Sequence, residues 1–392
     1  MTPVTQSTSA TQTAVPQTPP PATARYFMIG GFLGAGKTTA VAALAQRLVQ
    51  QGLRIGLITN DQGSELVDTA MLRARGFATE EISGGCFCCR FNSLVDAAQK
   101  LDDATRPDAF VAEPVGSCTD LVATVTYPLR RMYGNRFQIA PLSVLVDPVR
   151  AEQVLGIAPA RKFSDKVLYI WKKQAEEADL LVITKSDLLD EARLDRLKSA
   201  LAEAFPGKDI LPVSVRTGAG VDAWFDRLQT TVPLLRPAMA VDYDLYAEGE
   251  ALLGWLNATV AIQGPSFDAN ALLKALAEDL RSRLGEAEIA HLKMTFNPDA
   301  GLGDIAAVSL VRSDFVPELS LTLDGPAESG QLILNLRVEA DPSTLRTAVE
   351  AAIAALPQRL PGLSARLDHA EQFRPGRPTP THRDTHADLV AA

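Results

Sequence analysis

The residues with the clearest chemical potential lie near the N-terminus and read Gly31-Phe32-Leu33-Gly34-Ala35-Gly36-Lys37-Thr38. This order fits the pattern G-x-x-x-x-G-K-[ST], in which glycines let backbone N–H groups curve around phosphate oxygens without a Cβ clash. We expect Lys37 to reach the β- and γ-phosphates of a nucleotide and the hydroxyl of Thr38 to bind Mg²⁺. A glycine-rich turn that binds nothing is the alternative. The predicted phosphate contacts are Gly31, Gly34, Ala35, Gly36, Lys37, Thr38 and Thr39.

A second motif, Thr184-Lys185-Ser186-Asp187, could choose the base and resembles the N-K-x-D motif of GTPases. The Asp187 carboxylate would accept two hydrogen bonds from the guanine edge, whereas adenine offers no matching donors, so we predict guanine preference. Lys185 could lay its alkyl stem along the base. Thr184 lacks the asparagine amide that would bind the base and brace the loop, so we expect a somewhat lower affinity. The alternative is that Ser186 or Asp187 only caps a helix. Ser214 and Val215, which follow the next apolar run, are expected to back the base.

A third element, Glu113-Pro114-Val115-Gly116, also follows an apolar run and could sense the γ-phosphate. We expect Glu113 to reach Mg²⁺ and the Gly116 N–H to meet the phosphate, which makes Lys37, Thr38, Glu113 and Gly116 the predicted catalytic set. An ordinary turn at a strand end is the alternative. The order of the motifs favours the site, because each follows a strand and the carboxyl ends of parallel strands share one edge of a sheet. We see no obvious arginine finger or catalytic glutamine, so we expect slow turnover that a partner stimulates.

Three of the four cysteines fall within four residues, in Ser83-Gly84-Gly85-Cys86-Phe87-Cys88-Cys89. Such crowding does not suit a disulfide framework and favours metal or redox chemistry. Three thiolates could converge on one metal, zinc by default, with a coordination position left open for transfer. Cys118 is a candidate fourth ligand. The alternatives are a redox thiol group or buried cysteines that act as small apolar residues. His382 and His386 could bind metal weakly, but histidines near a chain end are more often incidental.

Composition narrows the class of protein. The chain has 392 residues, 46% of them hydrophobic and 22% charged, with a formal net charge of −9. An acidic chain without a long basic run is a poor candidate for binding nucleic acid. No stretch is apolar for long enough to predict a transmembrane helix, and residues 1–24 lack the features of a secretory signal and are expected to be disordered. We therefore predict a cytoplasmic protein without a membrane or nucleic-acid partner.

The elements that must position these motifs alternate along residues 25–235. Short apolar runs are separated by helical segments, which predicts a mainly parallel sheet covered on both faces. A linker follows, and residues 243–358 then show several strand-like runs with few helices, which predicts a smaller α+β domain with an antiparallel sheet. Residues 374–392 are expected to form a flexible tail.

Taken together, these motifs resemble the CobW/HypB/UreG class of GTPases, and its CobW branch most closely. The resemblance rests on GGFLGAGKTT at 30–39, Asn60-Asp61-Gln62-Gly63, SGGCFCC at 83–89, and the Glu113 and Asp187 motifs described above. It implies a Rossmann-like P-loop domain of the α/β class followed by a smaller α+β domain. It also implies that Cys86, Cys88 and Cys89 are metal ligands. Asp61, where the family commonly has Glu, could serve Mg²⁺ or the transferred metal.

The resemblance implies a GTP-hydrolysing metallochaperone that delivers zinc, or cobalt, to a client metalloprotein. GTP and Mg²⁺ would order the segments around residues 60–68 and 84–89, and hydrolysis would relax them and make the metal transferable. Two other functions stay open: an ATP-using P-loop enzyme such as a small-molecule kinase, and a nucleotide-gated scaffold for a metal- or cobalamin-dependent enzyme. The sequence leaves open the metal, the client and the oligomeric state.

Overall fold

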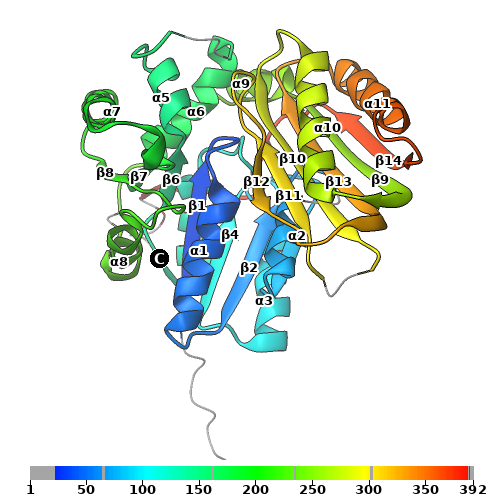
Figure 1. The fold of residues 1–392 in the computed structure, drawn as a ribbon. Coiled ribbons are helices and arrows are strands. Elements are labelled where there is room, and N and C mark those ends of the chain that lie inside the picture. The colour runs from blue at the N-terminus through cyan, green and yellow to red at the C-terminus, as the bar shows by residue number, and fades with distance from the viewer. Residues whose placement is uncertain are drawn as a thin grey trace, which may run out of the picture.

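The computed structural model describes residues 23–63, 67–159, 163–233, 235–300, 303–386 and 388. Most of the predicted N-terminal disordered segment, and part of the predicted tail, therefore lie outside the described residues. The described chain contains two sheets, the first built from the N-terminal half and the second from the C-terminal half (Figure 1). Among the described residues, no helix is both long and apolar enough to cross a membrane.

The first sheet has eight strands in the order β3-β2-β4-β1-β6-β7-β8, with β5 also paired to β1, and its pairs are parallel. This confirms the predicted α/β class with a mainly parallel sheet. The strands are β1 Ala24–Gly31, β2 Ile55–Asn60, β3 Thr79–Ile82, β4 Ala109–Glu113, β5 Phe137–Ile139, β6 Ser143–Val146, β7 Leu180–Ile183 and β8 Asp209–Pro212.

Helices cover both faces of this sheet because its strands are apolar on both sides. On β1, Phe27 and Ile29 pack in one core with α1 and α8, whereas Tyr26 and Met28 pack in another with α3, α4 and α6. The helical elements of this half are α1 Lys37–Gln50, α2 Val67–Ala74, α3 Phe91–Thr105, η1 Val122–Thr126, α4 Tyr127–Tyr133, α5 Pro148–Val154, α6 Asp165–Glu177, η2 Ser186–Leu188, α7 Glu191–Ala204 and α8 Val221–Thr230.

The second sheet is antiparallel, in the order β12-β11-β10-β13-β9-β14, as predicted for an α+β domain. Helices α10 and α11 pack on one of its faces in a separate apolar core. The C-terminal elements are α9 Tyr243–Leu252, β9 Gly254–Phe267, α10 Ala269–Leu284, β10 Ile289–Pro298, β11 Ala306–Leu310, β12 Glu318–Leu321, β13 Ala327–Val338, α11 Pro342–Arg359 and β14 Ser364–Phe373. Strand β14 lies beyond the predicted domain limit of residue 358, so the sheet extends further along the chain than expected.

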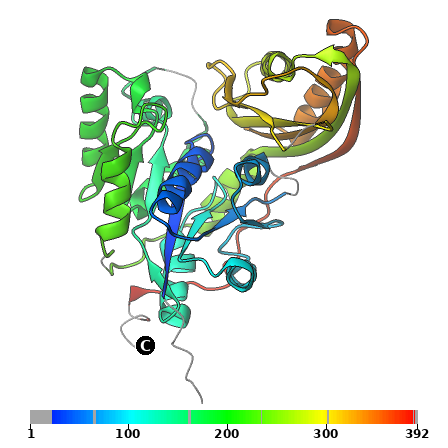
Figure 2. The same ribbon diagram turned by 60° about the horizontal axis from the view of Figure 1, so that its bottom comes forward.

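The face of the second sheet opposite α10 and α11 is turned toward the first domain (Figure 2). Val67 and Met71 of α2 pack there against Ile305 and Ala307. After β14 the chain runs back along the first domain, where the Thr381 N–H donates to the carbonyl oxygen of Cys88. The two domains are therefore connected by packing as well as by the chain.

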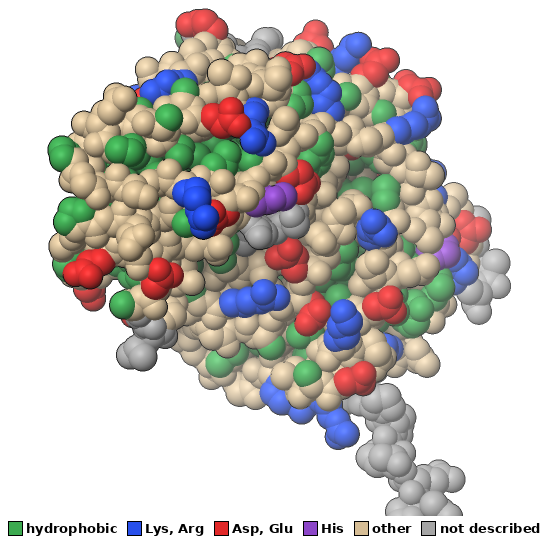
Figure 3. Space-filling view, turned by 90° about the vertical axis from the view of Figure 1, so that its right-hand side faces the viewer, with side chains coloured by type: hydrophobic (Ala, Val, Ile, Leu, Met, Phe, Trp, Pro, Cys, Tyr) green, Lys and Arg blue, Asp and Glu red, His purple; other side chains and the backbone are tan. Residues whose placement is uncertain are grey.

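On the side of the molecule seen in Figure 3, acidic and basic side chains are interspersed among apolar ones.

Candidate functional site

The predicted phosphate loop connects β1 to α1 in a conformation that only glycine adopts readily. Gly34 and Gly36 have φ angles of 79° and 89°, in the left-handed region. A Cβ atom on Gly34 would lie 3.0 Å from the carbonyl oxygen of Ala290 and 3.0 Å from Cβ of Val311, both in the C-terminal domain. The loop thus needs glycine at position 34 for its own backbone and for the close approach of the second domain.

A hydroxyl and two carboxylates converge beside this loop. Thr38 Oγ1 lies 2.7 Å from Asp68 Oδ1 and 3.0 Å from Glu113 Oε1. Glu113 Oε2 is buried and has no hydrogen-bond partner among the described residues. Burial, with the nearby Asp68 carboxylate, raises the pKa of Glu113 to about 7. Hydroxyl and carboxylate oxygens are the ligands Mg²⁺ prefers, and an unpartnered buried oxygen is costly without a cation, so these residues fit magnesium.

The remaining predicted phosphate residues adjoin this group. Burial lowers the pKa of Lys37, which makes its ammonium group dependent on nearby anions. Gly116 packs against the phosphate loop, because a Cβ there would lie 3.0 Å from the Leu33 backbone nitrogen. Asp61 is engaged elsewhere: its carboxylate oxygens accept hydrogen bonds of 3.0 and 3.1 Å from Arg337 Nη2 of β13. A metal-binding role for Asp61 stays a prediction.

The predicted base loop follows β7 and contacts the phosphate loop directly. Lys185 Nζ donates to the Gly34 carbonyl oxygen at 3.0 Å. The Thr184 hydroxyl lies 2.8 Å from the Ala35 carbonyl oxygen, so threonine still braces the phosphate loop. A hydroxyl at this position therefore reaches the loop that an asparagine amide was expected to brace, and the somewhat lower guanine affinity stays a prediction. The contact with the base stays a prediction.

A cavity of about 330 Å³ joins the two loops. Asp187 lies in its wall, and Arg216 Nη1 is 3.7 Å from the Asp187 carboxylate. This volume is within the range of ligand pockets. The first domain contributes predicted residues Gly34, Gly36, Lys37, Thr38, Thr39, Thr184, Lys185, Asp187, Ser214 and Val215. The opposite wall belongs to the C-terminal domain and includes Lys293, Val308, Ser309, Val311, Phe315, Glu318, Leu319 and Ser320. No motif in the sequence predicted this second wall.

The cysteine cluster lies between β3 and α3, on the other side of β4 from the base loop. Within the described residues, Cys86, Cys88 and Cys89 form the group of potential metal ligands whose donor atoms lie within 4.8 Å of one another. Their sulfur–sulfur distances are 2.8 Å for Cys86–Cys88, 3.2 Å for Cys86–Cys89 and 3.7 Å for Cys88–Cys89. A tetrahedral site with Zn–S bonds of about 2.3 Å requires sulfur atoms roughly 3.7 Å apart. Zinc therefore fits after small movements of the thiols.

Cys118, in the segment after β4, is hydrogen-bonded to Cys86 and Cys88 but is not one of the three residues in that group of potential ligands. Hydrogen bonds from the Cys118, Cys88 and Cys89 thiols hold the pKa of Cys86 well below its usual range. A thiol with this character ionises first and is the best prepared of the four to bind a metal. His382 contacts the ring of Phe91 edge-on at a centroid distance of 5.0 Å. It is not part of the group of potential ligands among the described residues.

Comparisons with known proteins agree with this arrangement. The family described as CobW/HypB/UreG, nucleotide-binding domain, matches residues 25–212. Residues 25–212 therefore form a CobW/HypB/UreG nucleotide-binding domain. Zinc chaperone YjiA of Escherichia coli is 29% identical over 181 residues, which cover 45% of this chain and 52% of that protein. Zinc chaperone CobW of a Sinorhizobium species is 29% identical over 204 residues, covering 45% and 54%. The chain thus spans about half the length of the curated relatives it matches.

The solved structures that resemble this chain have lower sequence identity to it than these two relatives. HypB from Archaeoglobus fulgidus has a TM-score of 0.37 and 21% identity, covering 54% of this chain and 91% of that chain. The Zn(II)-bound YjiA GTPase from E. coli has a TM-score of 0.35 and 16% identity, covering 84% and 99%.

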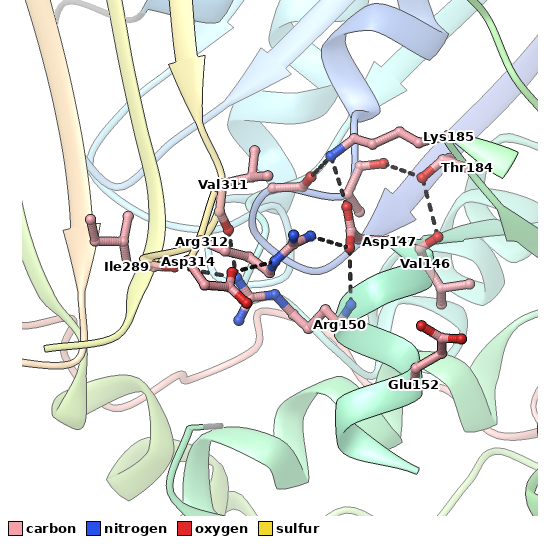
Figure 4. A network of polar contacts seen from close by, with 12 residues as sticks. Val146, Asp147, Arg150, Glu152, Thr184, Lys185, Ile289, Val311, Arg312 and Asp314 are labelled. Carbon is pink, nitrogen blue, oxygen red and sulfur yellow. Dashed lines mark hydrogen bonds and ion pairs between the residues drawn. The ribbon is translucent and has the colours of Figure 1, made fainter. Parts of the chain in front are cut away.

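The CobW/HypB/UreG domain is joined to the C-terminal domain by a buried network that includes the base loop (Figure 4). Asp147, at the end of β6, accepts hydrogen bonds from Lys185 Nζ at 2.8 Å and from Arg312 Nη1 at 3.2 Å. It also caps α5 by accepting from the Arg150 N–H at 3.0 Å. Burial would raise the pKa of Asp147, but Lys185 and Arg312 lower it to about 2. Arg150 in turn donates to the Val311 carbonyl oxygen at 2.6 Å.

A second set of contacts joins the end of β2 to the cysteine loop, the segment at 83–89 that carries Cys86, Cys88 and Cys89. Asn60, at the end of β2, donates through Nδ2 to the carbonyl oxygens of Ile82 at 3.0 Å and Gly85 at 2.7 Å. Gly85 directly precedes the first cysteine of the cluster. Two residues after Asn60, Gln62 donates to the buried Glu250 carboxylate at 3.3 Å. The end of β2 therefore contacts the cysteine loop through Asn60, and Gln62 contacts helix α9 through Glu250.

Sequence reasoning missed Asp68, Asp147, Lys293 and Arg312 as members of the site. Asp147 carried one local signal, because an aspartate before a proline at a strand end is a common helix start. The other three carried no motif that distinguishes them from ordinary surface residues.

Proposed function

We propose that this protein binds and hydrolyses GTP with Mg²⁺ and that its nucleotide state controls the binding and transfer of a metal held by Cys86, Cys88 and Cys89. Zinc is the proposed metal and cobalt the alternative. The observation that supports the proposal most directly is the Asn60 amide, which is hydrogen-bonded to Gly85 of the cysteine loop and begins the segment that leads to Asp68.

The chain's own groups suggest how the nucleotide would be held. The phosphate loop and Lys37 would bind the phosphates, and the Gly116 N–H would meet the terminal one. Thr38, Glu113 and Asp68 would hold Mg²⁺, which when bound neutralises developing charge on the phosphates. Asp187 would select guanine at the other end of the cavity. Because Asp68 lies eight residues after Asn60, a change at the phosphate end would be passed along a short segment to the cysteine loop.

The cargo metal would be bound by thiolates, beginning with Cys86 because its pKa is lowest in the cluster. Cys118 is the proposed fourth ligand, since its thiol is hydrogen-bonded to Cys86 and Cys88. A client metalloprotein would take the metal by offering a competing ligand. The client's identity and a cytoplasmic location stay predictions.

The experiment is a zinc affinity measurement by chelator competition, with GDP and then with a non-hydrolysable GTP analogue. We expect the two dissociation constants to differ by tenfold or more, which is about 1.4 kcal/mol of coupling. Asn60→Ala should reduce that difference while leaving GTP binding intact. Equal zinc affinity in both states would reject the coupling and leave a structural or redox-active thiol cluster.

Two control experiments distinguish the proposed function from the two alternative functions. Equal competition by ATP and GTP for the site would favour an ATP-using enzyme, and this outcome opposes the role assigned to Asp187. Client binding by metal-free, cysteine-substituted protein, with no metal transfer, would favour a nucleotide-gated scaffold.

A further inference from the structure

A lysine from the C-terminal domain reaches the proposed magnesium group. Lys293 Nζ lies 2.5 Å from Asp68 Oδ1 and 3.3 Å from Thr38 Oγ1. Lys293 belongs to β10, whereas Thr38 and Asp68 belong to α1 and α2 of the nucleotide-binding domain. A positive charge from the second domain is thus placed beside the phosphate loop.

The second sheet fixes the direction of this side chain. Along β10, Leu292 and Met294 point into the core beneath α10 and α11, so Lys293 between them points to the opposite face. Strand β10 is a central strand, in which Lys293 is paired with Ser309 of β11 and with Asn335 of β13. A residue on a central strand is held more precisely than one on a loop.

Among the described carboxylates, Asp68 forms the ion pair with Lys293 that the structure shows, at 2.5 Å, and Glu113 and Asp61 also lie near enough to act on its charge. Lys37 and Lys293 lie close enough that the charge of Lys293 helps to lower the pKa of Lys37, after burial itself. Asp68, Glu113 and Asp61 are the carboxylates that raise the pKa of Lys293 against the effect of burial. Mg²⁺ would compete for Asp68 and Glu113, and Asp61 is already paired with Arg337, so Lys293 would then need another anion nearby. A terminal phosphate is the anion that a nucleotide triphosphate would offer at this end of the cavity.

We infer that Lys293 is a phosphate-binding residue supplied by the C-terminal domain and that it contacts the terminal phosphate of GTP. The inference rests on the proposed GTP site. It is specific to the triphosphate because Lys293 approaches from the side of Thr38 and Asp68, and the base end of the cavity, at Asp187 and Ser214, is lined by other residues. The C-terminal domain would then respond to whether the γ-phosphate is present, which gives the nucleotide a direct contact with both domains.

The test compares nucleotide affinities of the full-length protein, using fluorescent GDP and a fluorescent non-hydrolysable GTP analogue with Mg²⁺. Lys293→Met keeps the length and apolar stem of the side chain but removes its charge. We expect it to weaken binding of the GTP analogue at least tenfold and binding of GDP by less than threefold. Lys274→Met is the matched control, because Lys274 is an exposed lysine of the same domain that does not line the cavity.

Equal losses for the two nucleotides, or none, would overturn the inference and leave Lys293 as a structural ion-pair partner of Asp68. A second measurement uses the wild-type protein, so that its result does not depend on whether the Lys293→Met variant folds. Acetylation of Lys293, followed by mass spectrometry, should be slower with the GTP analogue than with GDP, and equal rates would also overturn it. Failure of the proposed function looks different: the wild-type protein would then bind neither guanine nucleotide, or would bind ATP equally well.

Discussion

The interdomain network gives a sharp prediction at Asp147. Replacing this residue with asparagine removes its charge but keeps its size, and asparagine still caps a helix well. The hydrogen bond from the Arg150 N–H, which begins α5, can therefore persist. What is lost is the attraction to Lys185 in the base loop and to Arg312 in the C-terminal domain. Asp147→Asn thus tests the charged contacts that join the two domains.

The size of the effect follows from the pKa of Asp147, which is lowered from 3.8 to about 2. The difference, 3.8 − 2 = 1.8 pKa units, corresponds to about 2.5 kcal/mol, because each unit is about 1.36 kcal/mol. A carboxyl group whose pKa is lower in the folded state stabilises the fold above its unfolded pKa. That contribution disappears as the pH falls from about 4 through 2. We therefore expect a loss of about 2–3 kcal/mol at pH 7 and roughly half of that at pH 3.

Urea unfolding of the wild type and of Asp147→Asn at pH 7, 4 and 3 would measure this, with the difference between the proteins cancelling the titration of other groups. Asp195→Asn is the control, since Asp195 is an exposed carboxylate on α7 with a surface pair to Lys198. Its removal should cost less than about 1 kcal/mol. A loss of stability at Asp147 that is the same at pH 7 and pH 3, or no larger than that at Asp195, would refute the electrostatic account.

Three further predictions address the site itself. Asp187→Ala should reduce the preference for GTP over ATP at least tenfold in a competition assay, because the partner for the guanine edge is removed; a preserved preference would remove Asp187 from the base site. Glu113→Gln should reduce the tightening of GTP-analogue binding by Mg²⁺, measured against EDTA, and an unchanged effect would exclude Glu113 as a magnesium residue. Cys118→Ala should weaken zinc binding in chelator competition, and unchanged affinity would reject it as the fourth ligand.

The parts of the site that could be predicted from the sequence are those formed by short, contiguous motifs. The phosphate loop, the base loop and the cysteine run each need particular residues at fixed spacing, because a turn of the backbone must place them together. The two kinds of sheet were also predictable, since near-continuous apolar runs indicate buried parallel strands. Strand β14 was missed because most of its residues are polar and partly or fully exposed at the sheet edge.

The contacts between the domains could not be predicted in the same way. Lys293 and Asp68 are 225 residues apart, and Arg337 and Asp61 are 276 apart. The sequence around each of these residues has no motif that points to its partner. The partner is determined only by how the C-terminal sheet packs on the first domain. Thr184 shows a related limit, because its bracing contact depends on the position of the Ala35 carbonyl oxygen rather than on its own motif.

Residues between Asn60 and Asp68 contact both the cysteine loop and the C-terminal domain. Asn60 is bonded to the cysteine loop, Asp61 to Arg337, the Val67 N–H to Asn335, and Asp68 to Lys293. A rearrangement at Asp68 on nucleotide binding would therefore alter the C-terminal sheet and the cysteine loop through one short stretch of chain. Since the partners of Asp61, Val67 and Asp68 all lie on β10 or β13, the C-terminal domain is positioned to hold these three residues in place. The proposed nucleotide dependence of metal binding therefore requires both domains.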